Sequence, residues 1–337
     1  MGDHPERDGF TPAWWCHGRH LQTVWRKLFG ETPSLPLRRE RWETPDDDFL
    51  DLDFLDTSSP SRDLDKAPTV LFLHGLEGSS RAKYILGMLR CIHRMKWRGV
   101  ALNFRSCSGE INRQRRFYHS GETTDLDWVV GRLRTLRPGS PLFIVGVSLG
   151  GNVLLKWLGE KGKEADEAIQ AAVAISVPYD LGVAARLVDQ GVSRIYGLAF
   201  LRTLKQKALL KARQYPDLVD PNVVCRIVSF AEFDDKVTGP IHGFSSGIDY
   251  WARNSSQKFL SGVRRPTLLI HAKDDPFLPI TYLPKREIFQ SKWLITDIQP
   301  TGGHAGFVQG RRPWSATYWA ESRTMEFLSS FIEGKGK

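Results

Sequence analysis

The chain has 337 residues, of which 41% are hydrophobic and 25% charged. These proportions are typical of a globular protein and exclude a disordered chain or a small disulfide-stapled fold. Its apolar runs are far shorter than the ~20 residues of a membrane-spanning helix, and its first residues, MGDHPERDG, carry no apolar segment typical of a secretory signal. The net charge of +9 is compatible with nucleic acid, an anionic lipid surface or an anionic substrate.

The cysteines indicate a reducing compartment and no metal centre. Cys16, Cys91, Cys107 and Cys225 are widely spaced and form no C-x-x-C pair. The donors clustered over residues 16–20 are too few to make a convincing metal site. We therefore expect free thiols, a cytoplasmic protein and no bound metal. We also expect no cofactor.

In chain order, residues 1–45 are rich in tryptophan and proline and predict an N-terminal extension packed on the core. Near-alternation of apolar and acidic residues over 49–54 predicts a half-exposed strand. Later apolar runs are too continuous for one-sided strands and indicate a mostly parallel sheet covered by helices. The runs span 69–73, 99–104, 141–147, 171–177, 266–272 and 293–298. The expected helices span 81–97, 121–136 (capped by Ser120), 149–161 and 314–333.

One interval interrupts this alternation of strands and helices. Residues 178–265 show helical patterning and no clear strand. We expect a helical lid inserted over the carboxyl edge of the sheet, where ligand crevices form. The core then comprises residues 46–177 and 266–337.

A candidate nucleophile follows one of the apolar runs. Gly146-Val147-Ser148-Leu149-Gly150 lies between a predicted strand and a predicted helix. In this setting G-x-S-x-G indicates a tight turn that projects the serine oxygen from the backbone. A glycine-rich helix start is the alternative interpretation of this pattern when it is taken alone.

The partners of such a serine follow later strands. A serine hydroxyl needs a base, and the base needs an orienting acid. Asp274 and Asp275 follow the run 266–272, and His304 follows the run 293–298. We predict His304 as the base and favour Asp275 as the acid, with Asp274 as the alternative.

Stabilisation of an oxyanion requires backbone N–H groups aimed at the developing charge. The amide of Leu149, directly after the serine, is one predicted donor. The loop after the run 69–73 reads His74-Gly75-Leu76-Glu77-Gly78, and the amide of Leu76 is the second. We expect His74 to hydrogen-bond within its loop, and the other candidate histidine, His119, to be structural as well.

These features, in this order at strand ends, predict an α/β-hydrolase fold. The chain further resembles the YheT-like group of α/β hydrolases along nearly its whole length. The segments that carry the resemblance are 12–15 (PAWW), 20–23 (HLQT), 74–80 (HGLEGSS), 103–105 (NFR), 107–110 (CSGE), 118–121 (YHSG) and 271–277 (HAKDDPF). The resemblance implies ester hydrolysis or acyl transfer on medium- or long-chain acyl substrates through a Ser–Asp–His triad. Ser106 departs from the group, which has glycine there.

The basic excess is concentrated in two stretches without acidic residues. Residues 78–109 hold seven Lys or Arg and residues 194–213 hold six. In the second stretch, apolar residues at helical spacing predict a basic amphipathic lid helix: Ile195, Leu198, Leu201, Leu204 and Ala208. A solvated helix face, contact with anionic lipid and recognition of a phosphate-bearing acyl donor remain open. No nucleic-acid-binding signature accompanies the charge.

The predicted function is that of a serine hydrolase that cleaves carboxylic esters through an acyl-serine intermediate. An acyltransferase that moves the acyl group to an alcohol is the alternative, and a non-catalytic lipid- or partner-binding protein is a third. The sequence leaves the oligomeric state open.

Overall fold

The computed structural model describes residues 9–56 and 66–333, so the segment expected to lack a secretory signal lies largely outside it. An eight-stranded sheet runs through the molecule in the order β1-β2-β4-β3-β5-β6-β7-β8. β2 is antiparallel to both neighbours and the other pairs are parallel. The strands are β1 (Leu37–Glu43), β2 (Phe49–Leu55), β3 (Thr69–Leu73), β4 (Arg98–Asn103), β5 (Leu142–Val147), β6 (Ala171–Ile175), β7 (Thr267–Ala272) and β8 (Leu294–Gln299).

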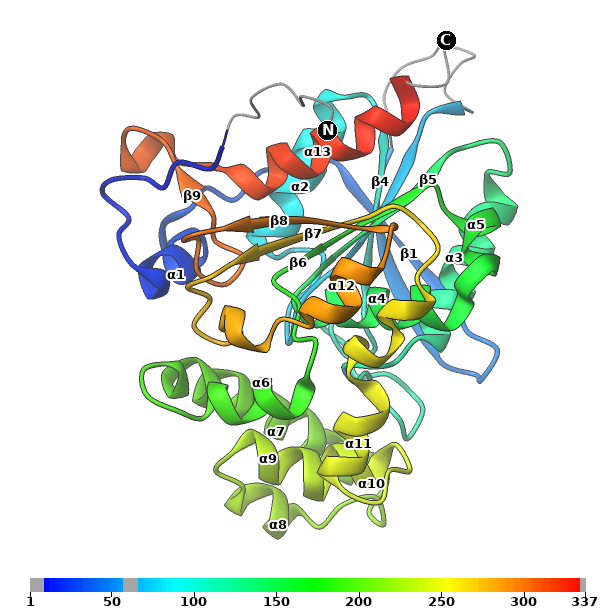
Figure 1. The fold of residues 1–337 in the computed structure, drawn as a ribbon. Coiled ribbons are helices and arrows are strands. Elements are labelled where there is room, and N and C mark those ends of the chain that lie inside the picture. Colours follow the sequence, from blue (N-terminus) through cyan, green and yellow to red (C-terminus); the bar gives the residue numbers. More distant parts are fainter. Residues whose placement is uncertain (1–8, 57–65, 334–337) are drawn as a thin grey trace.

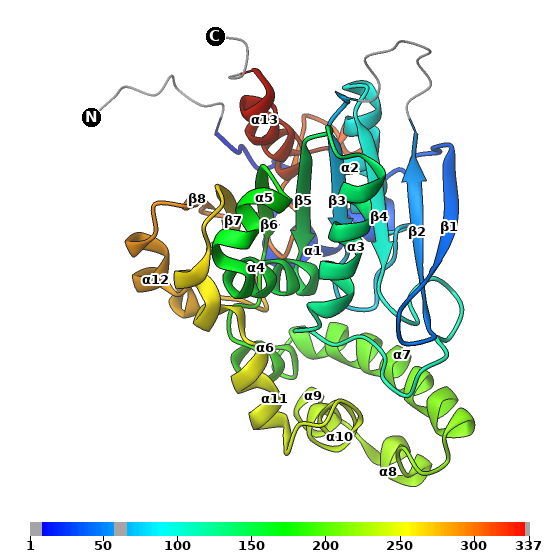
Figure 2. The same cartoon turned by 90° about the vertical axis from the view of Figure 1, so that its right-hand side faces the viewer.

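Helices cover both faces of the sheet, which explains its continuous apolar strands (Figures 1 and 2). In β3, Val70 and Phe72 pack on the side of α2 (Lys83–Arg94) and α13 (Trp319–Glu333). Leu71 and Leu73 pack on the side of α3 (Thr124–Leu136) and α4 (Leu149–Lys161). The short helices α5 (Ala165–Ala168) and α12 (Lys285–Gln290) complete the core.

β2 is buried, so the prediction of a half-exposed strand is wrong. Asp51 and Asp53 are at most 3% exposed, and the register places them directly opposite Arg41 and Arg39 of β1. The guanidinium groups bind the carboxylates at 2.8 Å in both pairs. The acidic residues therefore face arginines rather than water, and β1, predicted as part of the extension, is the edge strand of the sheet.

Two helix starts also differ from prediction. α3 begins at Thr124, and the Glu122 carboxylate accepts a hydrogen bond from the Thr124 amide at 2.8 Å, so Ser120 is not its cap. The last helix begins at Trp319 rather than at 314. The preceding chain forms a 3₁₀ turn (Pro313–Ser315) and the strand β10 (Thr317–Tyr318), which pairs with β9 (Val308–Gln309).

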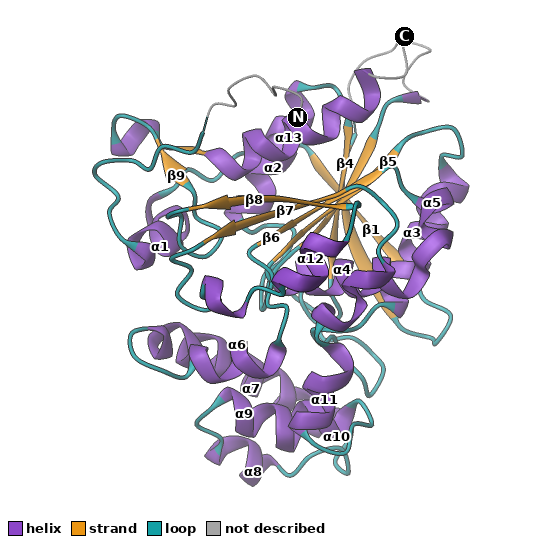
Figure 3. Ribbon diagram, viewed as in Figure 1, coloured by secondary structure: helices purple, strands orange, loops and turns teal. Residues whose placement is uncertain are grey.

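A helical insertion lies between β6 and β7, beyond the carboxyl ends of the strands (Figure 3). It contains α6 (Leu181–Val188), α7 (Ser193–Gln214), α8 (Pro221–Arg226), α9 (Phe230–Phe233), α10 (Gly239–Ile241) and α11 (Gly247–Asn254). Across residues 9–56 and 66–333, no helix combines the length and apolarity needed to cross a bilayer.

The long helix of the insertion, α7, differs in part from the predicted amphipathic helix. Leu201, Leu204 and Ala208 are buried as expected, whereas Ile195 and Leu198 are 68% and 50% exposed. In the first two turns of α7 the buried face is instead formed by Ser193 and Gly197. Two apolar side chains of the predicted stripe therefore face solvent.

Candidate active site

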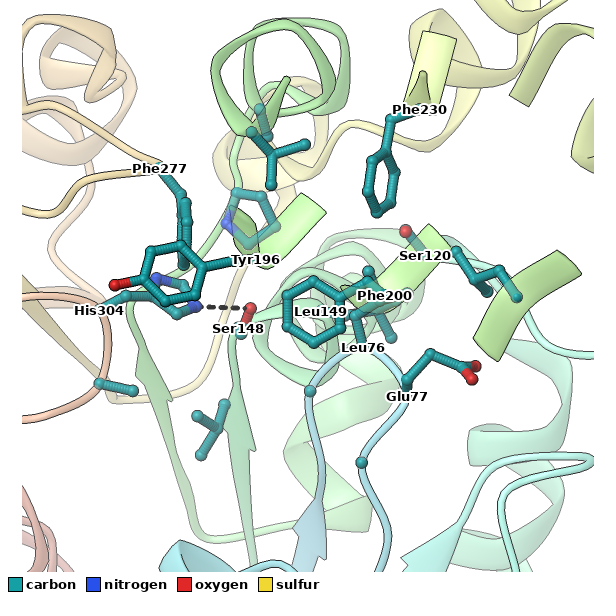
Figure 4. Close-up of a pocket in the computed structure, with 18 of the residues that line it drawn as sticks. Leu76, Glu77, Ser120, Ser148, Leu149, Tyr196, Phe200, Phe230, Phe277 and His304 are labelled. Carbon is teal, nitrogen blue, oxygen red and sulfur yellow. Dashed lines mark hydrogen bonds between the residues drawn. The ribbon is translucent and has the colours of Figure 1, made fainter. Parts of the chain in front are cut away.

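A cavity of about 570 Å³ lies between the carboxyl edge of the sheet and the insertion. It opens beside β3 and β5, where the strand order reverses and ligand crevices form in open α/β sheets. Its walls are predominantly apolar and include Leu181, Ala185, Val188, Phe200, Leu204, Phe230, Phe233 and Phe277. Ser148 and His304 line the same cavity (Figure 4).

Ser148 occupies the sharp turn between β5 and α4. Its φ of 53° lies in the left-handed region, which a non-glycine residue adopts only when the surroundings hold it there. The Ser148 amide donates to the Ile175 carbonyl of β6 at 2.8 Å. A Cβ atom at Gly150 would lie 2.5 Å from the carbonyl oxygen of Leu73, so the turn requires glycine there. The strand–turn–helix context predicted from the sequence is confirmed.

The structure brings together the three side chains predicted to form the triad. The Ser148 hydroxyl lies 2.9 Å from Nε2 of His304 (Figure 4). Nδ1 of His304 lies 2.8 Å from Oδ2 of Asp275. With a carboxylate at Nδ1, the ring proton resides on that nitrogen and leaves Nε2 free to accept from the serine. This tautomer can remove the hydroxyl proton.

The two aspartates have different partners. Asp275 is buried, and its other oxygen accepts from the amides of Phe277 and Leu278 at 2.9 and 3.1 Å. Asp274 instead accepts from the Gly303 amide at 3.0 Å, and burial raises the pKa of its carboxyl. Asp275 therefore contacts the imidazole, while Asp274 holds the loop that carries it.

The loop of His304 is also held by helix α1 (Arg19–Phe29) of the N-terminal extension. The His304 amide donates to the Thr23 hydroxyl at 2.9 Å. A Cβ atom at Gly303 would lie 2.4 Å from the carbonyl oxygen of Arg19, at a φ of +60°. Gln22 donates to the Val308 carbonyl and accepts from its amide. Residues 20–23 carry part of the family resemblance, but no local sequence pattern indicates this role.

Two other residues near the imidazole escaped prediction. Phe277 packs edge-on against His304 with ring centroids 4.8 Å apart, and Tyr196 of α7 packs edge-on against Phe277 at 5.3 Å. The hydroxyl of Tyr196 reaches Nδ1 of His20 in α1 at 3.3 Å. The first turn of α7 and the N-terminal extension thus meet near the imidazole.

The predicted oxyanion loop follows β3 and approaches the serine closely. A Cβ atom at Gly75 would lie 3.2 Å from the Cβ of Ser148. Nε2 of His74 accepts from the Phe104 amide at 3.2 Å, so Nδ1 carries the proton and donates to the Gly75 carbonyl at 2.7 Å. Burial lowers the pKa of His74 to about 4, so it is neutral, and its predicted structural role is confirmed.

The amides on either side of Leu76 each have a hydrogen-bond acceptor. The Gly75 amide donates to the Tyr84 hydroxyl at 2.8 Å, and the Glu77 amide donates to the Tyr118 hydroxyl at 2.9 Å. Within the described part of the chain, the amide of Leu76 between them has no hydrogen-bond acceptor. Leu76 and Leu149 lie beside Ser148 in Figure 4.

The side chains of His119 and Ser106 both form hydrogen bonds within the fold. Burial lowers the pKa of His119 to about 3, and its Nδ1 accepts from the Gly121 amide at 3.1 Å, as expected of a structural histidine. Ser106 has a φ of 65°, a conformation that favours glycine, and its hydroxyl hydrogen-bonds to Asn112 at 2.6 Å. The side-chain bond holds the loop in a conformation that glycine adopts readily.

Comparison with known proteins identifies the family. A sequence family described as "alpha/beta hydrolase fold" matches residues 68–293. The Escherichia coli protein named "Putative esterase YheT" is 37% identical over 330 residues, which cover 97% of this chain and 94% of that protein. The chain belongs to the YheT-like alpha/beta hydrolases.

Other relatives of this YheT-like hydrolase are named for lipid substrates. Mouse phospholipase ABHD3 is 30% identical over 96% of this chain and 79% of its own length. Monoacylglycerol lipase of Saccharomyces cerevisiae is 28% identical over 87% of this chain and 64% of its own length. The Pyrococcus furiosus esterase Pf2001 shares the fold, with a TM-score of 0.57, 15% identity and coverage of 89% of this chain and 92% of its own. The chain is an alpha/beta hydrolase of the esterase and lipase type.

Proposed function

We propose that this protein is a serine esterase that cleaves medium- or long-chain acyl esters through an acyl-serine intermediate. The observation that carries the proposal is the hydrogen-bonded series Ser148–His304–Asp275, of which Ser148 and His304 line an apolar cavity. Among the described residues, no other serine hydrogen-bonds to His304.

In the proposed mechanism, His304 takes the Ser148 proton as the oxygen attacks the ester carbonyl. Asp275 stabilises the imidazolium that forms, and the amides of Leu76 and Leu149 stabilise the oxyanion. Collapse of the tetrahedral intermediate releases the alcohol, which receives the proton from His304. Water then attacks the acyl-serine by the same steps and releases the acid.

The acyl preference is argued from the cavity. Its apolar wall extends from Leu149 to α6 and α9 of the insertion, where Val188, Phe230 and Phe233 line it. A flexible alkyl chain gains about 0.8 kcal/mol per buried methylene in such surroundings. This favours an acyl chain long enough to cross the cavity over a short one.

Two observations favour contact with a lipid surface. On α7, the exposed apolar residues Ile195 and Leu198 lie close in sequence to Tyr196 and Phe200, which line the cavity. On α1, Leu28 and Phe29 are 60% and 64% exposed and follow the cavity residue Lys27. Exposed apolar side chains combined with basic residues near a cavity suit an anionic interface.

An acyltransferase is supported by the basic side chains of the cavity wall. Lys27, Arg81 and Lys83 line the cavity and suit the phosphate of an acyl donor. The phosphate of a phospholipid substrate would suit the same basic side chains. Product ratios with added ethanol separate the two activities, because a transferase favours the alcohol over water beyond its concentration.

A fluorophosphonate probe tests the proposed nucleophile. The wild type and the control Ser315→Ala, whose exposed serine lies outside the cavity, should label and hydrolyse p-nitrophenyl esters. Ser148→Ala should do neither, and turnover should rise with acyl length across the ester series. Labelling of a well-folded Ser148→Ala variant would refute the assignment.

A further inference from the structure

A buried ion pair joins the insertion to the loop that carries Leu76. The ammonium of Lys207, on α7, lies 2.7 Å from Oε1 of Glu77. The side chains are only 16% and 6% exposed. Glu77 directly follows Leu76 in the chain, so a side chain of the insertion acts on the residue beside the predicted oxyanion donor.

The same carboxylate oxygen accepts a second hydrogen bond from the core. The Tyr118 hydroxyl donates to Oε1 of Glu77 at 2.7 Å and accepts from the Glu77 amide at 2.9 Å. Lys207 also lies 3.2 Å from the Cys107 sulfur, but burial raises the pKa of that thiol to about 11. The thiol is neutral at pH 7, so Glu77 supplies the charge that balances the ammonium.

The backbone at Glu77 needs such support. Its φ of 52° is unfavourable for a residue with a Cβ atom and persists only where other interactions hold it. Glycines on both sides of the Leu76–Glu77 pair, Gly75 and Gly78, allow the loop many other conformations. Figure 4 shows the Glu77 side chain directed away from Ser148, on the far side of Leu76. Glu77 lines the cavity, but its carboxylate is bound by Lys207 and Tyr118, so these contacts support the backbone of the loop.

We propose that Lys207 is a positioning residue that couples the docking of α7 to the geometry of the oxyanion hole. By fixing the Glu77 carboxylate, it holds the loop so that the Leu76 amide stays directed at the reacting carbonyl. The kinetic part of this inference rests on the proposed function. It extends that function because Lys207 itself is not among the residues that line the cavity.

Lys211, one turn further along α7, provides a matched control. Its ammonium is also buried and donates to the carbonyl of Asn112 at 2.6 Å, outside the oxyanion loop. Removal of either ammonium should weaken the docking of α7 on the core. Only removal of the Lys207 ammonium deprives Glu77 of a partner.

The experiment compares Lys207→Met with Lys211→Met by hydrogen exchange and by steady-state kinetics on a soluble p-nitrophenyl ester. In Lys207→Met, amides over residues 74–80 should exchange faster, and kcat should fall about tenfold with KM within about twofold, because a displaced donor weakens only transition-state binding. Lys207→Arg should restore most of kcat. Glu77→Gln, which keeps an acceptor but loses the charge, should fall between wild type and Lys207→Met.

Lys211→Met should lower the melting temperature comparably and leave kcat and the exchange of residues 74–80 near wild type. Equal effects of the two methionine variants on kcat would overturn the inference, and so would unchanged exchange in Lys207→Met. If the wild type lacks Ser148-dependent activity, the proposed function fails and the kinetic inference with it. The exchange measurement would still decide whether Lys207 holds the loop.

Discussion

The Thr23 hydroxyl accepts a hydrogen bond from the His304 amide across 281 residues of sequence, with 2.9 Å between Oγ1 and N. The same hydroxyl donates to the Arg19 carbonyl at 2.6 Å. Helix α1 therefore fixes the backbone of the proposed general base directly.

The substitution Thr23→Val should lower kcat/KM about tenfold. It leaves the His304 amide without its partner, and an unsatisfied donor costs about 1–3 kcal/mol. Thr135→Val is the control, since Thr135 donates to the carbonyl four residues earlier in α3 and lies on the surface. Steady-state kinetics on a soluble ester should show a loss only for Thr23→Val, and equal losses would contradict the role assigned to α1.

Substitution of the two neighbouring aspartates should have clearly different effects on kcat. Asp275→Asn removes the carboxylate at Nδ1 of His304 and should reduce kcat by ~10³–10⁴, the loss typical of a wrong imidazole tautomer. Asp274→Asn keeps an oxygen that accepts from Gly303, so its loss should stay below about tenfold. Turnover of a soluble ester and the rate of fluorophosphonate labelling measure both. The reverse order would make Asp274 the triad acid.

Asp234 should make stability depend on pH. Burial raises its pKa from 3.8 to about 6, despite hydrogen bonds from Trp251 and Thr238. The folded state then holds this proton more tightly than the unfolded chain does. Its contribution to stability is full below a pH of about 4 and is lost as the pH rises through about 6.

Asp234→Asn, which is uncharged throughout, should therefore raise the free energy of unfolding by up to about 3 kcal/mol at pH 8. The gain should shrink as the pH falls to 4, as measured by urea denaturation. Asp217→Asn is the control, because Asp217 is exposed and Arg115 lowers the pKa of its carboxyl. It should bring no gain at pH 8. If Asp234→Asn changed the free energy of unfolding equally at every pH, the folded protein would not raise the pKa of the Asp234 carboxyl.

The exposed apolar residues at the start of α7 should matter only at an interface. The double variant Ile195→Ser/Leu198→Ser should bind anionic vesicles at least about tenfold more weakly, because each aliphatic side chain contributes about 1.5–3 kcal/mol when fully buried. Its turnover of a soluble short-chain ester should match wild type. Phe289→Ser is the control, since Phe289 is 78% exposed on α12 and does not line the cavity. Equal vesicle binding by all variants would place the interface elsewhere.

The elements that carry the site were predictable because their signals are local. Ser148, Asp275 and His304 each follow a continuous apolar run, and the carboxyl ends of parallel strands meet at one edge of a sheet. The order of these runs along the chain therefore predicted that the three side chains lie close together. The boundaries of the strands that were predicted differ from the structure by at most two residues, whereas β1, β9 and β10 were not predicted as strands.

The contacts that hold the site in place join residues far apart in sequence, and no local sequence pattern reveals such contacts. The acidic residues of β2 indicated solvent exposure only because the arginines opposite them lie on another strand. Similarly, the basic stretches suggested surface charge. Arg105 is instead buried against Asp48 and Asp125, and Lys207 is paired inside the molecule. Part of the apparent basic surface is thus neutralised in the interior.

The pairing of α1 with the His304 loop has a consequence for the order of assembly during synthesis. The first helix emerges early, whereas the loop and β9, which bind it, are made near the end of the chain. Contacts so far apart in sequence form slowly and late. A nascent or truncated chain can hold a folded sheet and still lack an oriented imidazole. In the proposed mechanism, hydrolysis would therefore require that helix α1 and the loop of His304 have already come together.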